Sequence, residues 1–347
     1  MPRIWWASGM LSAIFMALSV ASAAGGTDTD DAPSKDGVPP SGSCGESEGC
    51  NDISPWGVSV DAVFLQRAAL DRSILLQPSG AQGTAASAAN ASDFKFNYQP
   101  GVDVTVVRNL SSDDGALDAI DFRYLGVNGI DDSFQTFLPT GDNVPFKAFQ
   151  PFGNGAPQYW NLAYKSDIQS MEINTHYDLP SYLTFLAGVR WMELDEHLLM
   201  DANVPIIPQV ANFDFGTKND LVGLQLGLRA NSGSDLGRWR LDGSLKAGVY
   251  DDFARNSFGV AVNGTNNVFH AADSADQVAF VGEMQLKLQF LFSQHLTGEI
   301  GYETLWIDGV AIAGNQVSAT DITTHSGIST SGHAFYQGAI AGLNLRF

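Results

Sequence analysis

Apolar and polar residues alternate with a period of two along most of this chain. The final segment, Phe335 to Phe347, shows it clearly, because Ala339, Ala341 and Leu343 are apolar while Gly342, Asn344 and Arg346 separate the later apolar residues. A period of two places the apolar side chains on one face of a strand. An outer-membrane barrel strand needs this pattern, since lipid lies outside and a polar lumen inside. The last strand of a soluble sandwich is the alternative for this segment alone.

About ten segments alternate in this way. They are Trp56 to Arg67, Phe94 to Val106, the stretches around Phe122, Ile173, Val189, Leu226, Ala247, Leu286 and Ile300, and the C-terminal strand. Several are as long as the ~9–11 residues of a tilted membrane crossing. Strands of soluble proteins are usually nearer ~5–6 residues. The segment lengths therefore favour a membrane barrel.

The connectors between these segments alternate in length. Short ones lie at residues 110–115, 178–181, 231–237 and 293–295, and long ones at 68–93, 126–161, 195–218, 251–275 and 313–331. All the short ones fall on the side that holds both ends of residues 55–347, as periplasmic turns do in outer-membrane barrels. The sequence predicts an all-β fold over residues 55–347, a transmembrane antiparallel up-and-down β-barrel. We expect about ten strands, within a range of 8–12, and periplasmic termini; twelve would require a hairpin from Phe137 to Phe152.

The N-terminal residues predict export. Arg3, the apolar run from Ile4 to Val20 and the Ala21-Ser22-Ala23 site are typical of a secretory signal peptide, here residues 1–23. Residues 24–54 are acidic and rich in Gly, Ser and Pro, which predicts a disordered periplasmic tail. In that oxidising compartment Cys44 and Cys50 are candidates for a small disulfide. The predicted location is the bacterial outer membrane.

Charged residues at the inward-facing positions give the candidate site. The acids are Asp61, Asp103, Asp121, Glu172, Asp178, Asp242, Glu283, Glu299 and Glu303, and the bases are Arg67, Lys95, Arg123, Arg190, Arg229, Arg238, Arg240, Lys246, Lys287 and Arg346. These charges nearly cancel, so the net charge of −20 must come from the loops and the tail. Because a narrow barrel lets opposite charges pair across it, we expect a salt-bridged interior or a narrow, weakly selective channel. The acidic balance argues against nucleic acid as a partner.

Four stretches resemble a known family. They are Gly188 to Glu196, Arg238 to Tyr250, Phe280 to Glu283, and Gly301 to Ala313, the last with the sequence G-Y-E-T-L-W-I-D-G-V-A-I-A. Together they resemble the β-barrel porin family numbered seven, a group of bacterial outer-membrane proteins, over roughly Trp56 to Phe347. Several members carry Pro near the position of Gly314, where this chain departs. The resemblance implies an outer-membrane barrel and supplies no catalytic residues.

The leading functional prediction is a narrow porin or channel for small solutes or ions, or a structural membrane barrel. The alternative is a surface adhesion or binding protein that uses long acidic loops. A third hypothesis is a hydrolase at the outer rim, near Asp195-Glu196-His197 and Asp251-Asp252, although we predict no enzyme, cofactor or metal. Expected partners are membrane lipid, lipopolysaccharide and the barrel assembly machinery, which would contact the strand ending in Phe347. The oligomeric state is left open.

Overall fold

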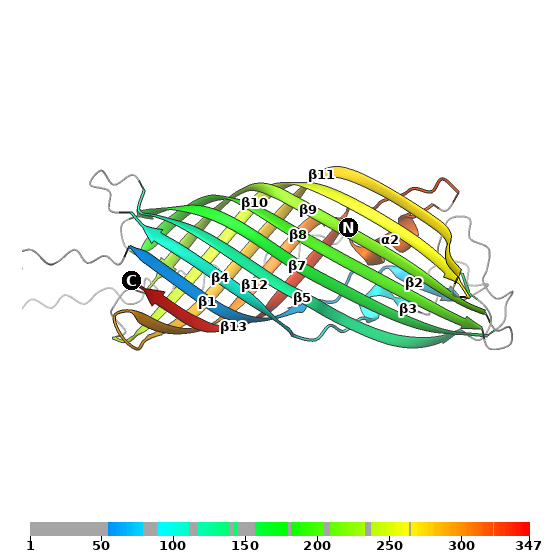
Figure 1. The fold of residues 1–347 in the computed structure, drawn as a ribbon, viewed down its shortest axis with the longest axis horizontal. Helices are drawn as coiled ribbons and strands as arrows, with labels where there is room; N and C mark the ends of the chain where they lie inside the picture. Colours follow the sequence, from blue (N-terminus) through cyan, green and yellow to red (C-terminus); the bar gives the residue numbers. More distant parts are fainter. Residues whose placement is uncertain are drawn as a thin grey trace, which may run out of the picture. The chain divides into compact units, whose positions relative to one another are not determined.

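The computed structural model describes residues 55–78, 89–110, 117–138, 142–143, 157–179, 182–204, 209–232, 237–263, 265–321 and 323–347. Ten antiparallel strands form a closed barrel (Figure 1). They are β1 (Trp56–Arg67), β4 (Gln99–Asn109), β5 (Ala119–Leu138), β7 (Gln158–Leu179), β8 (Leu183–Val204), β9 (Gln209–Asn231), β10 (Trp239–Val262), β11 (Thr265–Leu291), β12 (Leu296–Val310) and β13 (Gly332–Arg346). The predicted fold class is therefore confirmed. The signal peptide, the acidic tail and the Cys44–Cys50 disulfide lie outside the described residues.

The barrel closes at β1, which pairs with β13 on one side and β4 on the other. At the edge of this seam the Trp56 N–H donates to the Phe347 carbonyl at 3.0 Å, and the Phe347 N–H returns a bond of the same length. We call the end that holds these two residues the terminal end, and the opposite end the far end. The tight turn of residues 292–295 also lies at the terminal end, since the Arg346 N–H bonds to the His295 carbonyl.

The wall strands are longer than the sequence pattern indicates. β10 and β11 have 24 and 27 residues and pair through most of the predicted loop of residues 251–275. The predicted twelve-strand alternative is wrong for the wall, because β6 (Asp142–Asn143) pairs with the short strand β2 (Ile74–Pro78) instead. The segment Phe94 to Tyr98, expected at the start of a wall strand, precedes β4 and leaves the wall.

The polarity of the wall inverts partway along its strands. In β8, Phe185 and Val189 face outward near the terminal end, and the buried Arg190 faces inward. Beyond Trp191 the buried, inward side chains are mostly apolar, with Leu194 and Leu198 on either side of the buried Glu196. The outward positions there are Glu193, Asp195 and His197. The structure thus has a polar interior with an apolar exterior in its terminal half, and the reverse in its far half.

Neighbouring strands invert at the same level. The change falls at adjacent apolar pairs with one member on each face: Phe64–Leu65 in β1, Tyr124–Leu125 in β5, Trp191–Met192 in β8, Leu221–Val222 in β9 and Val249–Tyr250 in β10. In β9 the exposed outward stretch from Val222 runs about nine residues to the terminal end, which matches one membrane crossing. The outward apolar residues of this half are called the belt below.

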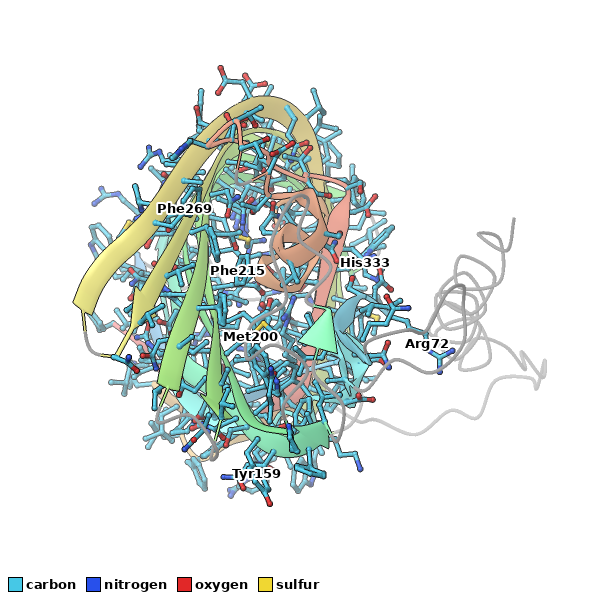
Figure 2. All side chains as sticks on the ribbon, turned by 90° about the vertical axis from the view of Figure 1, so that its right-hand side faces the viewer. Arg72, Tyr159, Met200, Phe215, Phe269 and His333 are labelled. Carbon is cyan, nitrogen blue, oxygen red and sulfur yellow. The ribbon has the colours of Figure 1, made fainter. Side chains whose placement is uncertain are left out.

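Chain segments from two connections fill the far half of the barrel. We call them the plug: residues 70–76, residues 89–98 and helix α2 (Ala313–Ala319). The first two segments are joined by β2 with β3 (Ala89–Asn90), and a short 3₁₀ helix (Ala91–Asp93) follows. Viewed from the far end, α2 lies within the ring of strands (Figure 2). It contacts β2, β8 and β9.

Candidate functional site: the filled lumen

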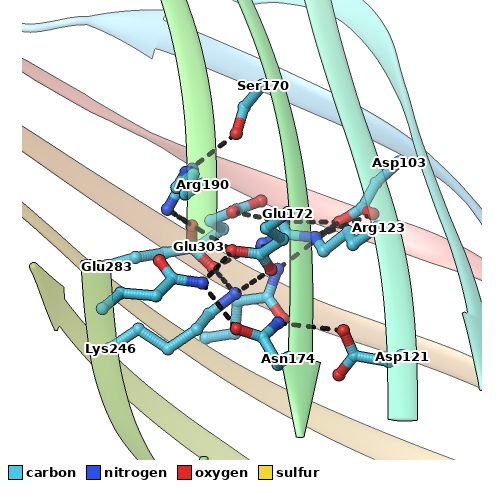
Figure 3. A network of polar contacts seen from close by, with 12 residues as sticks. Asp103, Asp121, Arg123, Ser170, Glu172, Asn174, Arg190, Lys246, Glu283 and Glu303 are labelled. Atoms are coloured by element: carbon cyan, nitrogen blue, oxygen red, sulfur yellow. Dashed lines mark hydrogen bonds and ion pairs between the residues drawn. The ribbon is translucent and has the colours of Figure 1, made fainter. Parts of the chain in front are cut away.

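Arg123 on β5 is the centre of a polar network that crosses the lumen (Figure 3). Its Nε and Nη2 donate to Asp103 at 2.9 and 2.7 Å. Nη2 also donates to Glu303 on β12 at 2.7 Å, and Nη1 to Glu283 on β11 at 2.5 Å. All four side chains are buried. One guanidinium therefore joins strands from both sides of the ring.

Two more cations complete this network. Arg190 on β8 donates from Nη1 to Glu283 at 2.7 Å and from Nε to the Ser170 hydroxyl at 2.8 Å. Lys246 on β10 contacts Glu172 and lies 2.9 Å from Glu283. The set of Asp103, Arg123, Glu172, Arg190, Lys246, Glu283 and Glu303 is called the central network. It holds three cations and four carboxylates, and every one is buried.

A second polar layer lies nearer the terminal end. Lys287 bridges Asp61 at 2.7 Å and Glu299 at 2.9 Å. The Glu299 carboxylate also accepts bonds from Ser59 at 2.8 Å and Gln289 at 3.0 Å. Three donors therefore contact this carboxylate.

His176 and Asn174 hold Asp121 on the opposite side of the same layer, at 2.5 and 2.9 Å. Between the two groups lies a cavity of about 90 Å³. The described side chains of this layer therefore leave a small cavity between the two groups.

On the far side of the central network, one ion pair joins two wall strands beside the plug. Arg67 on β1 and Glu196 on β8 approach to 2.8 Å, and both side chains are almost completely buried. The Arg67 guanidinium also lies over the rings of Tyr164 and Tyr336, 5.2 and 5.9 Å from their centroids. Buried charges of this kind need both a partner and a polarisable surround, and the rings supply the second.

The plug itself packs as a soluble core does. Phe94 and Phe96 lie 5.4 and 5.6 Å from the Tyr164 ring. The N–H of Ala313, the first residue of α2, donates to Glu196 at 3.2 Å. The side-chain amide of Asn219 on β9 donates to the Ala311 carbonyl at 2.8 Å and accepts from the Ala311 N–H at 2.7 Å. These contacts close the far half of the barrel with protein atoms.

Three arginines lie at the terminal end of the lumen. Arg229, Arg240 and Arg346 point inward here, and Arg346 is repelled by the other two arginines and attracted by Asp242 and Glu299. Arg229 donates to Asp242 at 2.8 Å. For Arg240 and Arg346, the described part of the chain offers no carboxylate within ion-pair distance. We call these three residues the basic mouth.

Most of the predicted lumen residues lie where the alternation places them. The lumen-facing candidates Asp121, Arg123, Glu172, Arg190, Asp242, Lys246, Glu283, Glu299 and Glu303 are buried, and Lys287 is nearly so. Lys95 is the exception, because it precedes β4 and is exposed. Asp178, Arg238 and Arg346 lie at the exposed edge of the terminal end. The near neutrality of the whole set hides a separation: the central network is net negative and the basic mouth net positive.

The residues of the rim-hydrolase hypothesis are divided between the two faces of the wall. Glu196 and Asp252 face inward, whereas Asp195, His197 and Asp251 face outward. The ring nitrogens of His197 lie 3.4 and 3.6 Å from Asp195 and Asp214. Of the hydroxyls, Ser257 lies nearby, across Gly216 from His197, but its Oγ faces the Gly216 carbonyl at 3.5 Å. These groups show no contact between a nucleophile and a base.

No cluster that could hold a metal ion occurs among the residues that the structure describes. Within the same residues, no helix has the length and apolar character needed to cross a membrane.

The plug and the Arg67–Glu196 pair were not expected from the sequence. The only signal for them was the pair of buried aromatic residues Phe94 and Phe96, which the alternation assigned to a wall strand.

No protein-family model and no curated protein sequence matches the chain, so the resemblance to the porin family numbered seven stays a prediction. Solved structures of outer-membrane proteins are similar in fold. The outer-membrane protease OmpT from Escherichia coli aligns at 10% identity and a TM-score of 0.45, covering 84% of this chain and 96% of OmpT. The toluene transporter TodX from Pseudomonas putida aligns at 10% identity and a TM-score of 0.32, covering 84% and 90%. An anion-selective porin from Comamonas acidovorans gives 10% identity and 0.22, covering 84% and 98%. At these values the function has to be argued from the residues of the barrel.

Proposed function

We propose that this chain is an outer-membrane β-barrel with a closed lumen, which serves as a structural or ligand-binding barrel in its resting form. The inversion of wall polarity is the observation that carries the membrane assignment. An apolar exterior over about nine residues per strand suits lipid, and the polar exterior beyond it suits water. With short turns at the terminal end, that end faces the periplasm.

The filled lumen argues against an open diffusion pore. A solute entering from the far end meets the plug first and the central network next. To pass, it would have to displace α2 and then separate Arg123 from buried carboxylates, which is costly because the charges lose their partners in a region away from water. Passage of small ions or solutes therefore requires a rearrangement of the plug.

A surface-binding role is the second candidate, and the length of the wall favours it. A strand of 24 residues such as β10 has a contour of roughly 80 Å, which a tilt of about 40° reduces to a height of roughly 60 Å. An apolar band of about 25 Å occupies less than half of this height. The remaining wall stands in water with a rigid core and polar outer side chains, which is a suitable platform for binding another molecule.

Bilayer conductance tests the closed lumen. The mature chain, shown to be folded by its heat-modifiable gel mobility, should give no discrete conductance steps in planar bilayers. Gly314→Trp should displace α2, because a side chain at Gly314 meets Ala91 Cβ at 3.2 Å, and it should produce steps only together with Arg123→Met, because the central network also closes the lumen. Gly259→Trp is the matched control, since nothing lies within 4 Å of its added Cβ. Large steps from the unmodified chain would disprove the closed lumen and restore the open porin.

The signal peptide, the outer-membrane location and the partners belong to the same proposal. Cleavage after Ala23, recovery of the mature protein with outer-membrane vesicles, and loss of assembly on deletion of Phe347 are the expected results. Recovery with the soluble fraction would contradict the membrane assignment. Lipid and lipopolysaccharide are expected to contact the belt and the polar wall just beyond it.

A further inference from the structure

The basic mouth is the one layer of the lumen where described cations lack partners. In the layers above it, Arg67, Arg123, Arg190, Lys246 and Lys287 each lie within 3 Å of a carboxylate oxygen. At the mouth, Asp242 accepts a hydrogen bond from Arg229. The Glu299 carboxylate contacts Lys287, Ser59 and Gln289. Arg240, on the strand next to that of Arg229, and Arg346, on β13, have no ion-pair partner among the described carboxylates.

Two polar atoms at this level point to a missing ligand. The Nε of Arg240 is shielded from water and has no hydrogen-bond acceptor among the described residues. The same holds for Asn344 Oδ1, which lacks a donor. Asn344 lies two residues from Arg346 on the inward face of β13. A rotation of its amide group by 180° would turn a donor to the same place. Leaving such atoms unpaired costs free energy that a bound group would recover.

We propose that the basic mouth binds a soluble, multiply charged oxyanion of the phosphate class. Guanidinium groups offer pairs of N–H donors that match the geometry of phosphate oxygens. The side chains come from the adjacent strands β9 and β10 and from β13, which lies three strands away from β10 in the ring. Since the side chains face the lumen and not the belt, the ligand arrives from water and not from the lipid layer. This inference goes beyond the closed-barrel proposal and needs only the folded barrel.

Titration of the full mature chain in a non-ionic detergent with pyrophosphate tests this site. Isothermal calorimetry should show saturable binding with one ligand per chain, and pyrophosphate should raise the unfolding temperature. Arg240→Gln and Arg346→Gln should each weaken binding about tenfold or more, as expected for the loss of a charged hydrogen bond. Arg255→Gln is the matched control, because Arg255 is exposed on the outer wall of the far half, 3.3 Å from Asp220. Its affinity should equal that of the unmodified chain.

The stability of the unliganded protein gives a second, independent measurement. At low ionic strength Arg346→Gln should unfold at a higher temperature than the unmodified chain, because it removes like-charge repulsion. Pyrophosphate should reverse this order. Absence of saturable binding, an affinity of both variants equal to that of the unmodified chain, or the same stabilisation by sodium chloride at matched ionic strength would overturn the proposal. Binding of a short-chain phosphatidate without binding of pyrophosphate would also overturn it, since the source would then be a lipid headgroup.

Discussion

The guanidinium of Arg123 on β5 lies 2.7 Å from the carboxylate of Glu303 on β12, although four strand-to-strand steps separate β5 from β12 around the ring by the shorter way. This contact spans the lumen. It shows that opposite walls of the barrel are tied together by side chains as well as through the sheet. The barrel interior is therefore part of the fold and not a free passage.

Replacing Arg123 should destabilise the barrel strongly. Arg123→Met leaves Asp103, Glu283 and Glu303 without their shared partner, and an uncompensated buried charge costs about 3–5 kcal/mol. Urea unfolding in detergent, followed by gel mobility, measures this loss. Arg255→Met on the exposed outer wall should cost less than about 1 kcal/mol. Equal effects of the two substitutions would show that the central network adds no stability.

A charged residue introduced into the belt should destabilise the barrel, and the loss of stability should depend on its depth in the membrane. Leu224 is 70% exposed within the outward stretch of β9, so Leu224→Arg should lower the free energy of unfolding by about 2–4 kcal/mol in a bilayer. Ser274→Arg on the far half of β11 faces water and should change it by about 0.5 kcal/mol or less. Refolding into lipid vesicles at graded urea concentrations gives both values. If Leu224→Arg is tolerated as well as Ser274→Arg, the belt does not face lipid.

The seam between β13 and β1 should depend on a glycine. A Cβ at Gly338 would collide with the backbone carbonyl of Phe64, which cannot move without breaking the β1–β13 pairing. Gly338→Ala should therefore cost about 1–3 kcal/mol, as overpacking does. Gly259→Ala in β10 has open space at its Cβ and should be close to neutral. The comparison uses thermal unfolding of both variants, and a neutral Gly338→Ala would mean that the seam adjusts freely.

Tyr164 should matter to the plug more than to the wall. Its hydroxyl donates to Glu196 at 2.5 Å, and its ring supports Arg67 and Phe94. Tyr164→Ala should expose residues of the plug to limited proteolysis while the wall strands stay protected. Tyr159→Ala, on the exposed outer face of the same strand, is the control and should leave the plug protected. Cleavage throughout the chain in Tyr164→Ala would instead show that plug and wall unfold together.

The wall and its inward charges could be predicted because both depend on local periodicity. Within the terminal half, Arg190 and Glu172 were assigned to the lumen from alternation alone, and the structure places both in the central network. The inversion of wall polarity is also present in the sequence, since an adjacent apolar pair such as Trp191–Met192 interrupts the alternation of apolar and polar residues. In a single strand such a pair looks like an irregularity. It indicates an inversion only when the same interruption is found at the same level in the neighbouring strands.

The plug could not be predicted, because its contacts are non-local. Phe94 and Phe96 alternate like strand residues, yet they pack on Tyr164, whose partner Glu196 comes from another strand. The connection of residues 313–331 reads as a polar loop, although Asn219 and Glu196 hold its first residues inside the barrel. The separation of charge along the lumen was missed for a similar reason. The sum of the inward charges of all strands does not show at which level of the lumen each charge lies.

The inversion of wall polarity also fixes the depth at which the barrel sits. Sliding outward by one pair of residues would expose Val222 and Val249 to water, and sliding inward would bring Asp220 and Asp251 into lipid. Both shifts are penalised around the ring, so the molecule has a single vertical position and little freedom to tilt. The level of the inversion therefore marks the membrane surface on the barrel wall, and each molecule should present its far half at one constant height above the membrane.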